Sequence, residues 1–202
     1  MKKLVVATSN PGKLKEMEEY LTGLDWQLVL KPADLEIEET GKTFVENAIL
    51  KASSVAKALG EWSIADDSGL AVDALDGAPG IYSARYADTD SDRIARLIKE
   101  LAHTTNRKAQ FVCAIALARP DGSIALQTEG VCHGEILQET RGSGGFGYDP
   151  IFYVPSQQQT FAEMSSETKN QVSHRGLAFA QLLPQIKQLT TNNIIPLDGT
   201  DN

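Results

Sequence analysis

The amino-acid sequence predicts one α/β domain in which helices flank a long mixed β-sheet. In the first half of the chain, short β-branched apolar runs alternate with amphipathic helical patterns, which is typical of α/β proteins. Two later apolar runs surround the turn sequence "RPDGS" and predict a β-hairpin, so the sheet also contains antiparallel strands. The 202 residues suffice for one sizeable core, and no repeat, linker or low-complexity tract divides them.

The first elements are a strand, a capped helix and a second strand. Residues 3–8, "KLVVAT", form a short apolar run that predicts a fully buried strand. Asn10 can cap the next helix, with Pro11 at the first helical position, where a missing N–H costs nothing. "WQLVL" at 26–30 predicts the second strand.

A second helix and a third strand follow. Thr43 and Glu46 stand in capping-box register before apolar residues at helical spacing, which predicts a helix. "WSIA" at 62–65 predicts a buried strand that ends in Asp66 and Asp67, and we expect a Ser-Gly turn directly after them.

The second half of the chain predicts two more helices around the hairpin and one further strand. Residues 91–102 are amphipathic at helical spacing, and "GYDPIFYVP" predicts a strand after the hairpin. Ser173 is the expected cap of the last helix. We predict a domain at 1–189 and a flexible tail at 190–202.

Composition and charge argue against several classes of protein. The net charge of -8 disfavours a surface that coats nucleic acid, and no apolar run approaches the length of a membrane-spanning helix. The N-terminus lacks the features of a signal peptide, so we expect a cytoplasmic protein with neither nucleic-acid nor membrane partners. Cys113 and Cys132 are too few for a disulfide framework and lie in apolar β runs, which predicts two buried thiols.

The first loop, "TSNPGK", is a candidate anion site, although it is not a P-loop. A P-loop requires glycine where Ala7 stands and a hydroxyl residue where Leu14 stands. A helix N-terminus with N–H donors and a lysine remains, and together these attract an anion. An ordinary capped helix with a solvated lysine is the alternative. The residues concerned are Thr8, Ser9, Asn10, Pro11, Gly12 and Lys13.

Acidic residues form a second candidate site. Asp66 and Asp67 directly follow a buried strand, and ligand sites of α/β folds collect at such strand ends. Adjacent carboxylates there need a cation or donors to compensate them, and side-chain alternation lets one of them face a given metal. If Glu38 or Glu39 lies near Asp67, the oxygen ligands would suit magnesium. Solvated acidic turns are the alternative.

Two further segments suit a nucleotide. "RGSGGFGYDPIFY" is rich in glycine, so a ligand can approach its backbone, and Phe146 or Tyr148 can stack on a planar ring. Lys169, His174 and Arg175 surround a helix start. A mobile hairpin loop and a solvated basic helix end are the alternatives. A Ser–His–Asp triad has little support, because the chain lacks a G-x-S-x-G elbow.

The combination and order of five blocks closely resemble the inosine/xanthosine triphosphate pyrophosphatase family over roughly residues 3–185. The blocks are "TSNPGK", "ETGKTFVENAILKA", "ADDSGLAVDALDGAPGIYSARYA", "GSGGFGYDPIFY" and "KNQVSHR". The resemblance implies two lobes around a substrate cleft and a homodimer. It also implies hydrolysis of ITP, dITP and XTP to a nucleoside monophosphate and pyrophosphate with Mg²⁺. A Maf-like pyrophosphatase for other modified or pyrimidine nucleotides and a non-catalytic nucleotide sensor are the alternatives.

The resemblance also assigns roles to residues. Asp67 would be the catalytic carboxylate, which aims or deprotonates the attacking water, and a metal ligand together with Glu38. The segment from Thr8 to Lys13 would hold phosphates. His174 and Arg175 would donate to the 6-oxygen of a keto base. The nucleotide site would be completed by Ser68, Phe146, Gly147, Tyr148, Asp149 and Lys169.

Overall fold

Seven strands form one sheet in the order β2-β1-β3-β4-β5-β6-β7. The computed structural model describes residues 2–191. The strands are β1 (Lys2–Val6), β2 (Trp26–Leu30), β3 (Trp62–Val72), β4 (Lys108–Ala118), β5 (Ile124–Ile136), β6 (Phe152–Val154) and β7 (Gln159–Thr160). β1 pairs in parallel with β2 and β3, and Val5 lies opposite both Val29 and Ser63. β6 pairs antiparallel with β5 and β7, which confirms the predicted mixed sheet.

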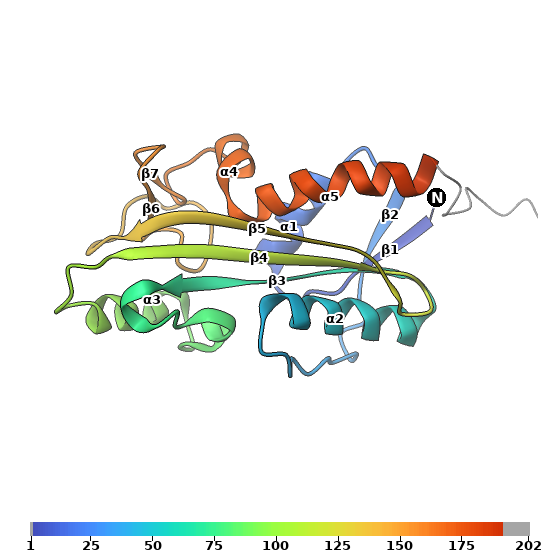
Figure 1. Cartoon of the computed structure of the whole chain (residues 1–202), viewed down its shortest axis with the longest axis horizontal. Helices are drawn as coiled ribbons and strands as arrows, with labels where there is room; N and C mark the ends of the chain where they lie inside the picture. The colour runs from blue at the N-terminus through green and yellow to red at the C-terminus, as the bar shows by residue number, and fades with distance from the viewer. Residues whose placement is uncertain (1, 192–202) are drawn as a thin grey trace, which may run out of the picture. The chain divides into compact units, whose positions relative to one another are not determined.

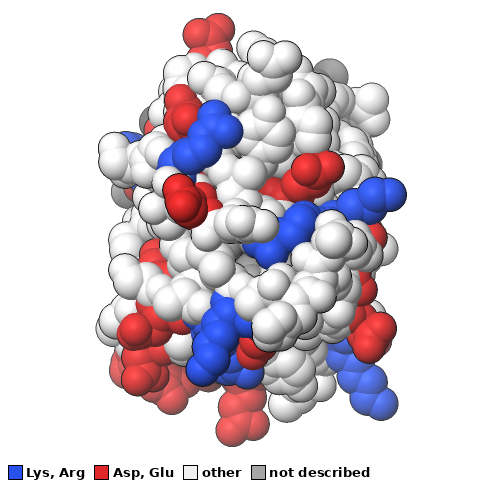
Figure 2. All heavy atoms as spheres, turned by 90° about the vertical axis from the view of Figure 1, so that its left-hand side faces the viewer, with Lys and Arg blue, Asp and Glu red and all other residues white. Residues whose placement is uncertain are grey.

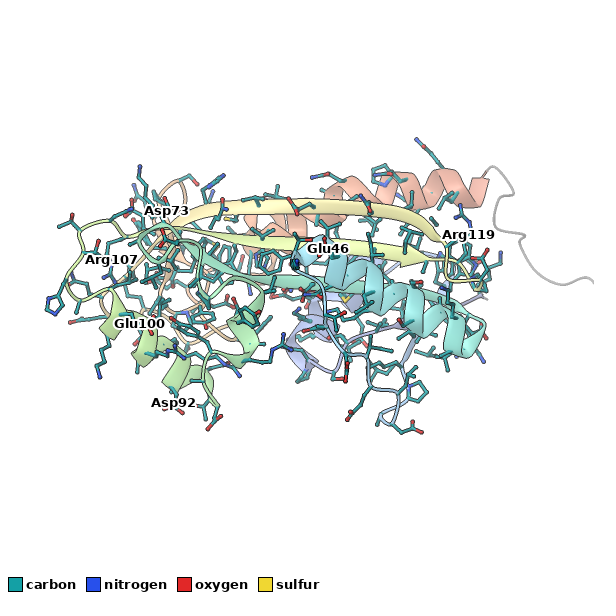
Figure 3. The ribbon with its side chains drawn as sticks, turned by 60° about the horizontal axis from the view of Figure 1, so that its bottom comes forward. Glu46, Asp73, Asp92, Glu100, Arg107 and Arg119 are labelled. Carbon is teal, nitrogen blue, oxygen red and sulfur yellow. The ribbon has the colours of Figure 1, made fainter. Side chains whose placement is uncertain are left out.

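The helices are α1 (Pro11–Leu21), α2 (Phe44–Leu59), α3 (Asp90–Glu100), α4 (Ser166–Val172) and α5 (His174–Thr191), with the 3₁₀ segments η1 (Asp73–Leu75) and η2 (Gly80–Arg85). Three of the helices, α1, α2 and α5, begin directly after the predicted caps Asn10, Thr43 and Ser173. Thr43 Oγ1 accepts a hydrogen bond from Glu46 N at 3.1 Å. The Glu46 carboxylate, at the start of α2 in Figure 3, accepts from Lys42 N rather than from the cap residue itself. Ser173 Oγ accepts from Gly176 N, as its predicted capping role requires.

The C-terminal region differs from the prediction in two respects. α4 was not expected, and α5 continues through residues 190 and 191 of the predicted tail. The remainder of that tail, 192–202, lies outside the described residues. No helix among residues 2–191 has both the length and the apolar character needed to cross a membrane.

The chain forms two compact units. Within the described residues, the first unit comprises 2–67, 114–129 and 178–191, and the second comprises 68–113 and 130–177. β3, β4 and β5 each contribute residues to both units.

In the first unit, α2 and α5 lie on opposite faces of the sheet (Figure 1). α2 presents small residues such as Ala48 and Ala52 to a core that includes Ala65 of β3. α5 contacts α1 through Phe179, whose ring stacks on Tyr20 at 4.6 Å. The alanines allow α2 to approach β3 closely, so polar residues of α2 can reach the aspartates of that strand.

The second unit has its own core. α3 contributes Ile94 and Leu97, which share a buried cluster with Leu70 of β3 and Phe111 of β4. Cys132 belongs to the same cluster, and burial raises the pKa of its thiol to about 11. Cys113 and Cys132 are both buried and neither is in a disulfide, which confirms the prediction of two buried thiols.

β3 corrects the predicted turn. The strand does not end at Asp66 and Asp67 but continues through Ser68 and Gly69 to Val72. The pairing of β1 with β3 covers Trp62–Ile64 and stops before this polar stretch, which extends beside β4, the other neighbour of β3 in the sheet. The two aspartates therefore lie within a strand rather than at its carboxyl end.

Two other strands are shorter than predicted. β1 ends at Val6, so Thr8 belongs to the following loop. The strand expected for "GYDPIFYVP" is reduced to Phe152–Val154, because Pro150 has no N–H for a sheet ladder and the residues before it form turns.

Candidate active site

Both carboxylate oxygens of Asp67 contact side chains of α2. Its Oδ1 lies 3.1 Å from Lys51 Nζ, and its Oδ2 accepts a hydrogen bond from Asn47 Nδ2 at 3.2 Å. Asn47 and Lys51 are four residues apart, which places them on one face of the helix. Burial raises the pKa of Asp67 above its ordinary value, and the nearby charges of Lys51 and Lys13 offset only part of this effect.

Lys51 joins Asp67 to Glu39. Its Nζ lies 2.7 Å from Glu39 Oε1 as well as 3.1 Å from Asp67 Oδ1. Burial alone would lower the pKa of Lys51, but Asp67, Asp66 and Glu39 outweigh burial and raise it. Lys51 is therefore a cation between two carboxylates. The predicted Glu38 is exposed, so the structure brings its neighbour Glu39, and not Glu38, to this group.

Asp66 takes a different partner from Asp67. Lys13 Nζ, from α1, lies 3.2 Å from Asp66 Oδ2, whereas the partners of Asp67 come from α2. Successive side chains of a strand alternate in direction, so the two aspartates contact different helices. The predicted lysine of the first loop thus lies beside the aspartate pair.

The first loop is a fully formed cap. Asn10 Oδ1 accepts hydrogen bonds from Gly12 N at 2.9 Å and Lys13 N at 3.2 Å, and Thr8 Oγ1 accepts from Asn10 N at 3.1 Å. The side chain of Ser9 is exposed. Two of the N–H groups predicted for an anion are therefore engaged by Asn10, and an anion at this helix end would share them.

The first unit supplies some of the ligands that a hard divalent cation needs. Glu39 and Asp67 supply oxygen ligands of the kind that Mg²⁺ prefers, and the Lys51 ammonium already marks a position that attracts positive charge. Among residues 2–191, no three His, Cys, Asp or Glu side chains converge into a complete metal site. One or two carboxylates completed by substrate and water are the usual protein contribution to Mg²⁺ binding.

Ser68 and Arg175 are joined in the second unit. Arg175 Nη2 donates a hydrogen bond to Ser68 Oγ at 2.9 Å, and the arginine is only 1% exposed. His174 is also buried and stacks on Phe111, with ring centroids 4.6 Å apart and an interplanar angle of 12°. Both predicted base donors are thus held in fixed positions, and Ser68 contacts Arg175.

The glycine-rich segment is an ordered loop anchored by Asp149. Lys169 Nζ lies 2.8 Å from Asp149 Oδ2, and Phe146 N donates to the same oxygen at 2.9 Å. Gly145 has φ of +72°, and a Cβ at this position would overlap Asp149 Oδ2, so only glycine fits. Lys169 Nζ also lies 5.2 Å from the centre of the Phe146 ring.

Phe146 and Tyr148 differ in their availability to a ligand. Tyr148 is buried in the core, and its hydroxyl donates to Ser83 O at 3.0 Å. Burial raises the pKa of Tyr148. Phe146 is only half-buried, so it is the aromatic side chain of this loop that can stack on a planar ring.

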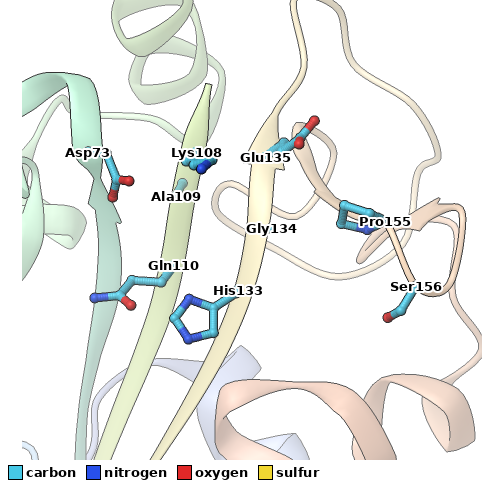
Figure 4. A pocket seen from close by; sticks show the side chains of 9 residues that line it. All are labelled: Asp73, Lys108, Ala109, Gln110, His133, Gly134, Glu135, Pro155 and Ser156. Carbon is cyan, nitrogen blue, oxygen red and sulfur yellow. The ribbon is translucent and has the colours of Figure 1, made fainter. Parts of the chain in front are cut away.

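A separate pocket of about 360 Å³ lies in the second unit (Figure 4). β4 and β5 contribute most of its lining residues, and acidic and basic side chains are mixed among them (Figure 4). None of the predicted site residues is among those that line it. They are Asp73, Lys108, Ala109, Gln110, His133, Gly134, Glu135, Pro155 and Ser156.

Sequence reasoning missed Asn47, Lys51 and Asp90. Asn47 and Lys51 are polar residues that interrupt the apolar pattern of α2 at a spacing of four, and this interruption was the available sign of a buried polar group. Asp90 Oδ2 accepts a hydrogen bond from Gly147 N at 2.8 Å, and no motif marks it.

Comparison with known proteins identifies relatives of this chain. The model of the Ham1 family matches residues 4–185. The chain is 65% identical to a dITP/XTP pyrophosphatase of Nostoc sp., over 94% of this chain and 97% of the relative. It is 60% identical to a dITP/XTP pyrophosphatase of Synechocystis sp., over 92% and 95% respectively. A solved HAM1 protein from Coxiella burnetii is 46% identical, with a TM-score of 0.85 over 93% of this chain and 100% of that one. The chain therefore belongs to the Ham1 family.

Proposed function

We propose that this chain hydrolyses ITP, dITP and XTP to the nucleoside monophosphate and pyrophosphate, and so removes non-standard purine nucleotides from the nucleotide pool. The observation that carries the proposal is Asp67, a buried carboxylate of raised pKa that two side chains of α2 hold in place. Membership of the Ham1 family and the relatives named dITP/XTP pyrophosphatase support the substrate class.

Asp67 aims and deprotonates the water that attacks the α-phosphorus. Because its pKa is raised, the carboxylate is a stronger proton acceptor than an ordinary aspartate. Contacts on both oxygens, from Lys51 and Asn47, restrict rotation of the carboxylate. The water can therefore be held along one line of attack, opposite the pyrophosphate that leaves.

Positive charge near the phosphates stabilises the leaving group. Charge grows on the bridging oxygen as the α–β bond breaks, so Lys13 and Lys51 stabilise the transition state more than the substrate. Mg²⁺, when bound, supplies further positive charge against the triphosphate. Asp67 and Glu39 would hold it, with Glu39 in the role first expected of Glu38.

The base is recognised by residues of the second unit. Phe146 offers a stacking surface beside Lys169, and His174 and Arg175 offer donors to the 6-oxygen of hypoxanthine or xanthine. Adenine presents a donor at the same position. One unmet buried donor costs about 1–3 kcal/mol, which corresponds to roughly fivefold to 150-fold discrimination.

We also propose that the protein is a cytoplasmic homodimer. The family resemblance supports the homodimer. Light scattering on the purified protein should return the mass of two chains, and the mass of one chain would contradict the dimer.

A substrate panel tests the function directly. The protein is incubated with ITP, dITP, XTP, GTP, ATP, UTP and CTP, with and without Mg²⁺, and the phosphate product is identified. We expect ITP, dITP and XTP to be turned over fastest, with release of pyrophosphate. Orthophosphate as the product, or preference for ATP, would contradict the proposal. Preference for a pyrimidine nucleotide would favour the Maf-like alternative, and binding without turnover would favour a sensor.

A further inference from the structure

We propose that Asp90 is a positioning residue that sets the affinity for the nucleotide base by fixing the loop that carries Phe146. The inference rests on the proposed function, because it assumes that Phe146 contacts the base. Asp90 is the first residue of α3, in a stretch of the chain that carries no family motif.

Two carboxylates hold the backbone on either side of the Phe146 α-carbon. Phe146 N donates to Asp149 Oδ2 at 2.9 Å, and the next amide, Gly147 N, donates to Asp90 Oδ2 at 2.8 Å. Fixing both amide directions fixes the backbone dihedral angles of Phe146, and hence the direction in which its ring leaves the chain. Hydrogen bonds from N–H groups to carboxylates are among the stronger kinds.

The two anchors differ in their surroundings. Asp149 is buried and pairs with Lys169, so that anchor is part of the core of the loop. The Asp90 side chain is 48% exposed and belongs to a separate element, α3. The direction of the Gly147 amide therefore depends on where α3 places this one carboxylate.

Asp90 is itself held in place by its helix. Its Oδ1 lies 2.6 Å from Arg93 Nη1, and Arg93 Nε donates to Ala87 O at 2.9 Å. Thr89 Oγ1 caps the same turn through Asp92 N at 3.1 Å. One oxygen of Asp90 thus contacts α3 and the other contacts the loop. Exposed ion pairs contribute little to folding stability. We therefore expect the loss of Asp90 to weaken substrate binding and to leave the free energy of unfolding nearly unchanged.

The test compares three variants by steady-state kinetics with ITP. Asp90→Ala removes the acceptor, and Asp90→Asn retains an oxygen that can accept the Gly147 N–H. Asp92→Ala is the matched control. Asp92, labelled in Figure 3, also lies in the first turn of α3 and contacts Thr89 instead of the loop, and its substitution removes the same charge. We expect Asp90→Ala to raise KM about threefold to tenfold, with kcat within about twofold of the wild type. Asp90→Asn should recover most of the affinity, and Asp92→Ala should match the wild type.

Two further measurements separate this role from a general structural one. Tripolyphosphate carries no base, so its inhibition constant should be the same for the wild type and Asp90→Ala. In a Phe146→Ala background, the Asp90→Ala change should have no further effect on KM, because the ring that Asp90 positions is absent. The melting temperature of each variant confirms that it is folded.

The outcomes distinguish this inference from the function on which it rests. Wild-type protein that does not turn over ITP contradicts both. Wild-type turnover with an unchanged KM in Asp90→Ala contradicts the inference alone. The inference alone is also contradicted if Asp90→Ala changes the inhibition constant for tripolyphosphate by the same factor as KM. The same holds if Asp90→Ala raises KM to the full extent in the Phe146→Ala background.

Discussion

At the scale of single residues, the two oxygens of Asp67 have separate partners on one helix. Asn47 donates to Oδ2, and Lys51 approaches Oδ1. The charge of this side chain and its placement can therefore be altered by different substitutions.

Asp67→Asn changes the charge and keeps the shape. We expect kcat for ITP to fall by roughly 100-fold or more, because an amide cannot accept the proton of the attacking water. Circular dichroism and thermal unfolding should show that the variant remains folded. Near-normal kcat in the folded variant would exclude Asp67 as the catalytic carboxylate.

Lys51→Met removes the cation between Glu39 and Asp67 and keeps the length of the side chain. The Lys51 side chain is 12% exposed, so its loss leaves two carboxylates with less compensation in a largely buried setting. We expect the free energy of unfolding to fall by about 3 kcal/mol and the melting temperature by roughly 6–12 °C. Lys42→Met, at an exposed lysine just before α2, is the control and should not change the melting temperature. Equal stability of the two variants would contradict this role.

The nature of the site could be predicted at this scale, but not every residue in it. Asp67 and Lys13 stand in recognisable motifs, and the structure places them near each other. Glu39 was indistinguishable from Glu38, because both lie in an irregular segment where no period fixes the direction of a side chain. Lys51 interrupts the apolar pattern of α2, but this sign is weak, because a lysine of an amphipathic helix is usually solvated at its charged end.

At the scale of elements, hydrogen bonds at the start of α2 link Gly41 to Asp67 through Asn47. Gly41 N donates to Asn47 Oδ1 at 2.8 Å, and Asn47 in turn donates to Asp67. A Cβ on Gly41 would lie 2.6 Å from Asn47 Oδ1, which is too close for the present arrangement. The position of Asn47 thus depends on a residue outside the helix.

Gly41→Ala should therefore act on catalysis through Asn47. Displacement of Asn47 removes one hydrogen bond to a charged group, and we expect kcat to fall about tenfold. Thr43→Ala is the comparison, since it removes the cap of α2 and costs about 1 kcal/mol of stability without touching Asn47. If both variants lose activity in proportion to their loss of stability, the Gly41 effect is general rather than local.

Most elements were predictable because their patterns were locally consistent. β2 and the caps at Asn10 and Thr43 lie where the sequence places them. The predicted third strand ended too early, because "DDSG" has low β propensity. The pairing that keeps β3 extended through these residues comes from the rest of the sheet. α4 is only seven residues long, too short for a helical period to be evident.

At the scale of the whole chain, acidic residues outnumber basic ones and the net charge is -8. Figure 2 shows lysine and arginine side chains interspersed with aspartate and glutamate on the face it presents. Every lysine described for the candidate site is paired with a carboxylate. The pairs are Lys13 with Asp66, Lys51 with Asp67 and Glu39, and Lys169 with Asp149.

This pairing predicts dependence on a divalent cation. Lysines that are already compensated neutralise a triphosphate only in part, so the remaining positive charge has to arrive with the metal. Treatment with EDTA should lower kcat/KM for ITP by roughly 100-fold or more, and added Mg²⁺ should restore it. Full activity in metal-stripped protein would contradict the assignment of Asp67 and Glu39 as metal ligands.

Because both cysteines are buried, we expect the folded chain to react slowly with thiol reagents. The thiolate is the reactive form, and the pKa of Cys132 is raised to about 11, so at pH 8 this thiol is almost entirely protonated. We expect a chromogenic disulfide reagent at pH 8 to label neither cysteine rapidly in native protein and both in guanidinium. Rapid labelling of the native protein would show that the core opens readily.

Slow reaction of the buried thiols has a practical use. Ser143→Cys would add an accessible sulfhydryl to the exposed tip of the glycine-rich loop, and a fluorophore would attach there without removal of either natural cysteine. Changes in emission on mixing with inosine nucleotides would then report, in real time, how fast this tip responds to an arriving ligand.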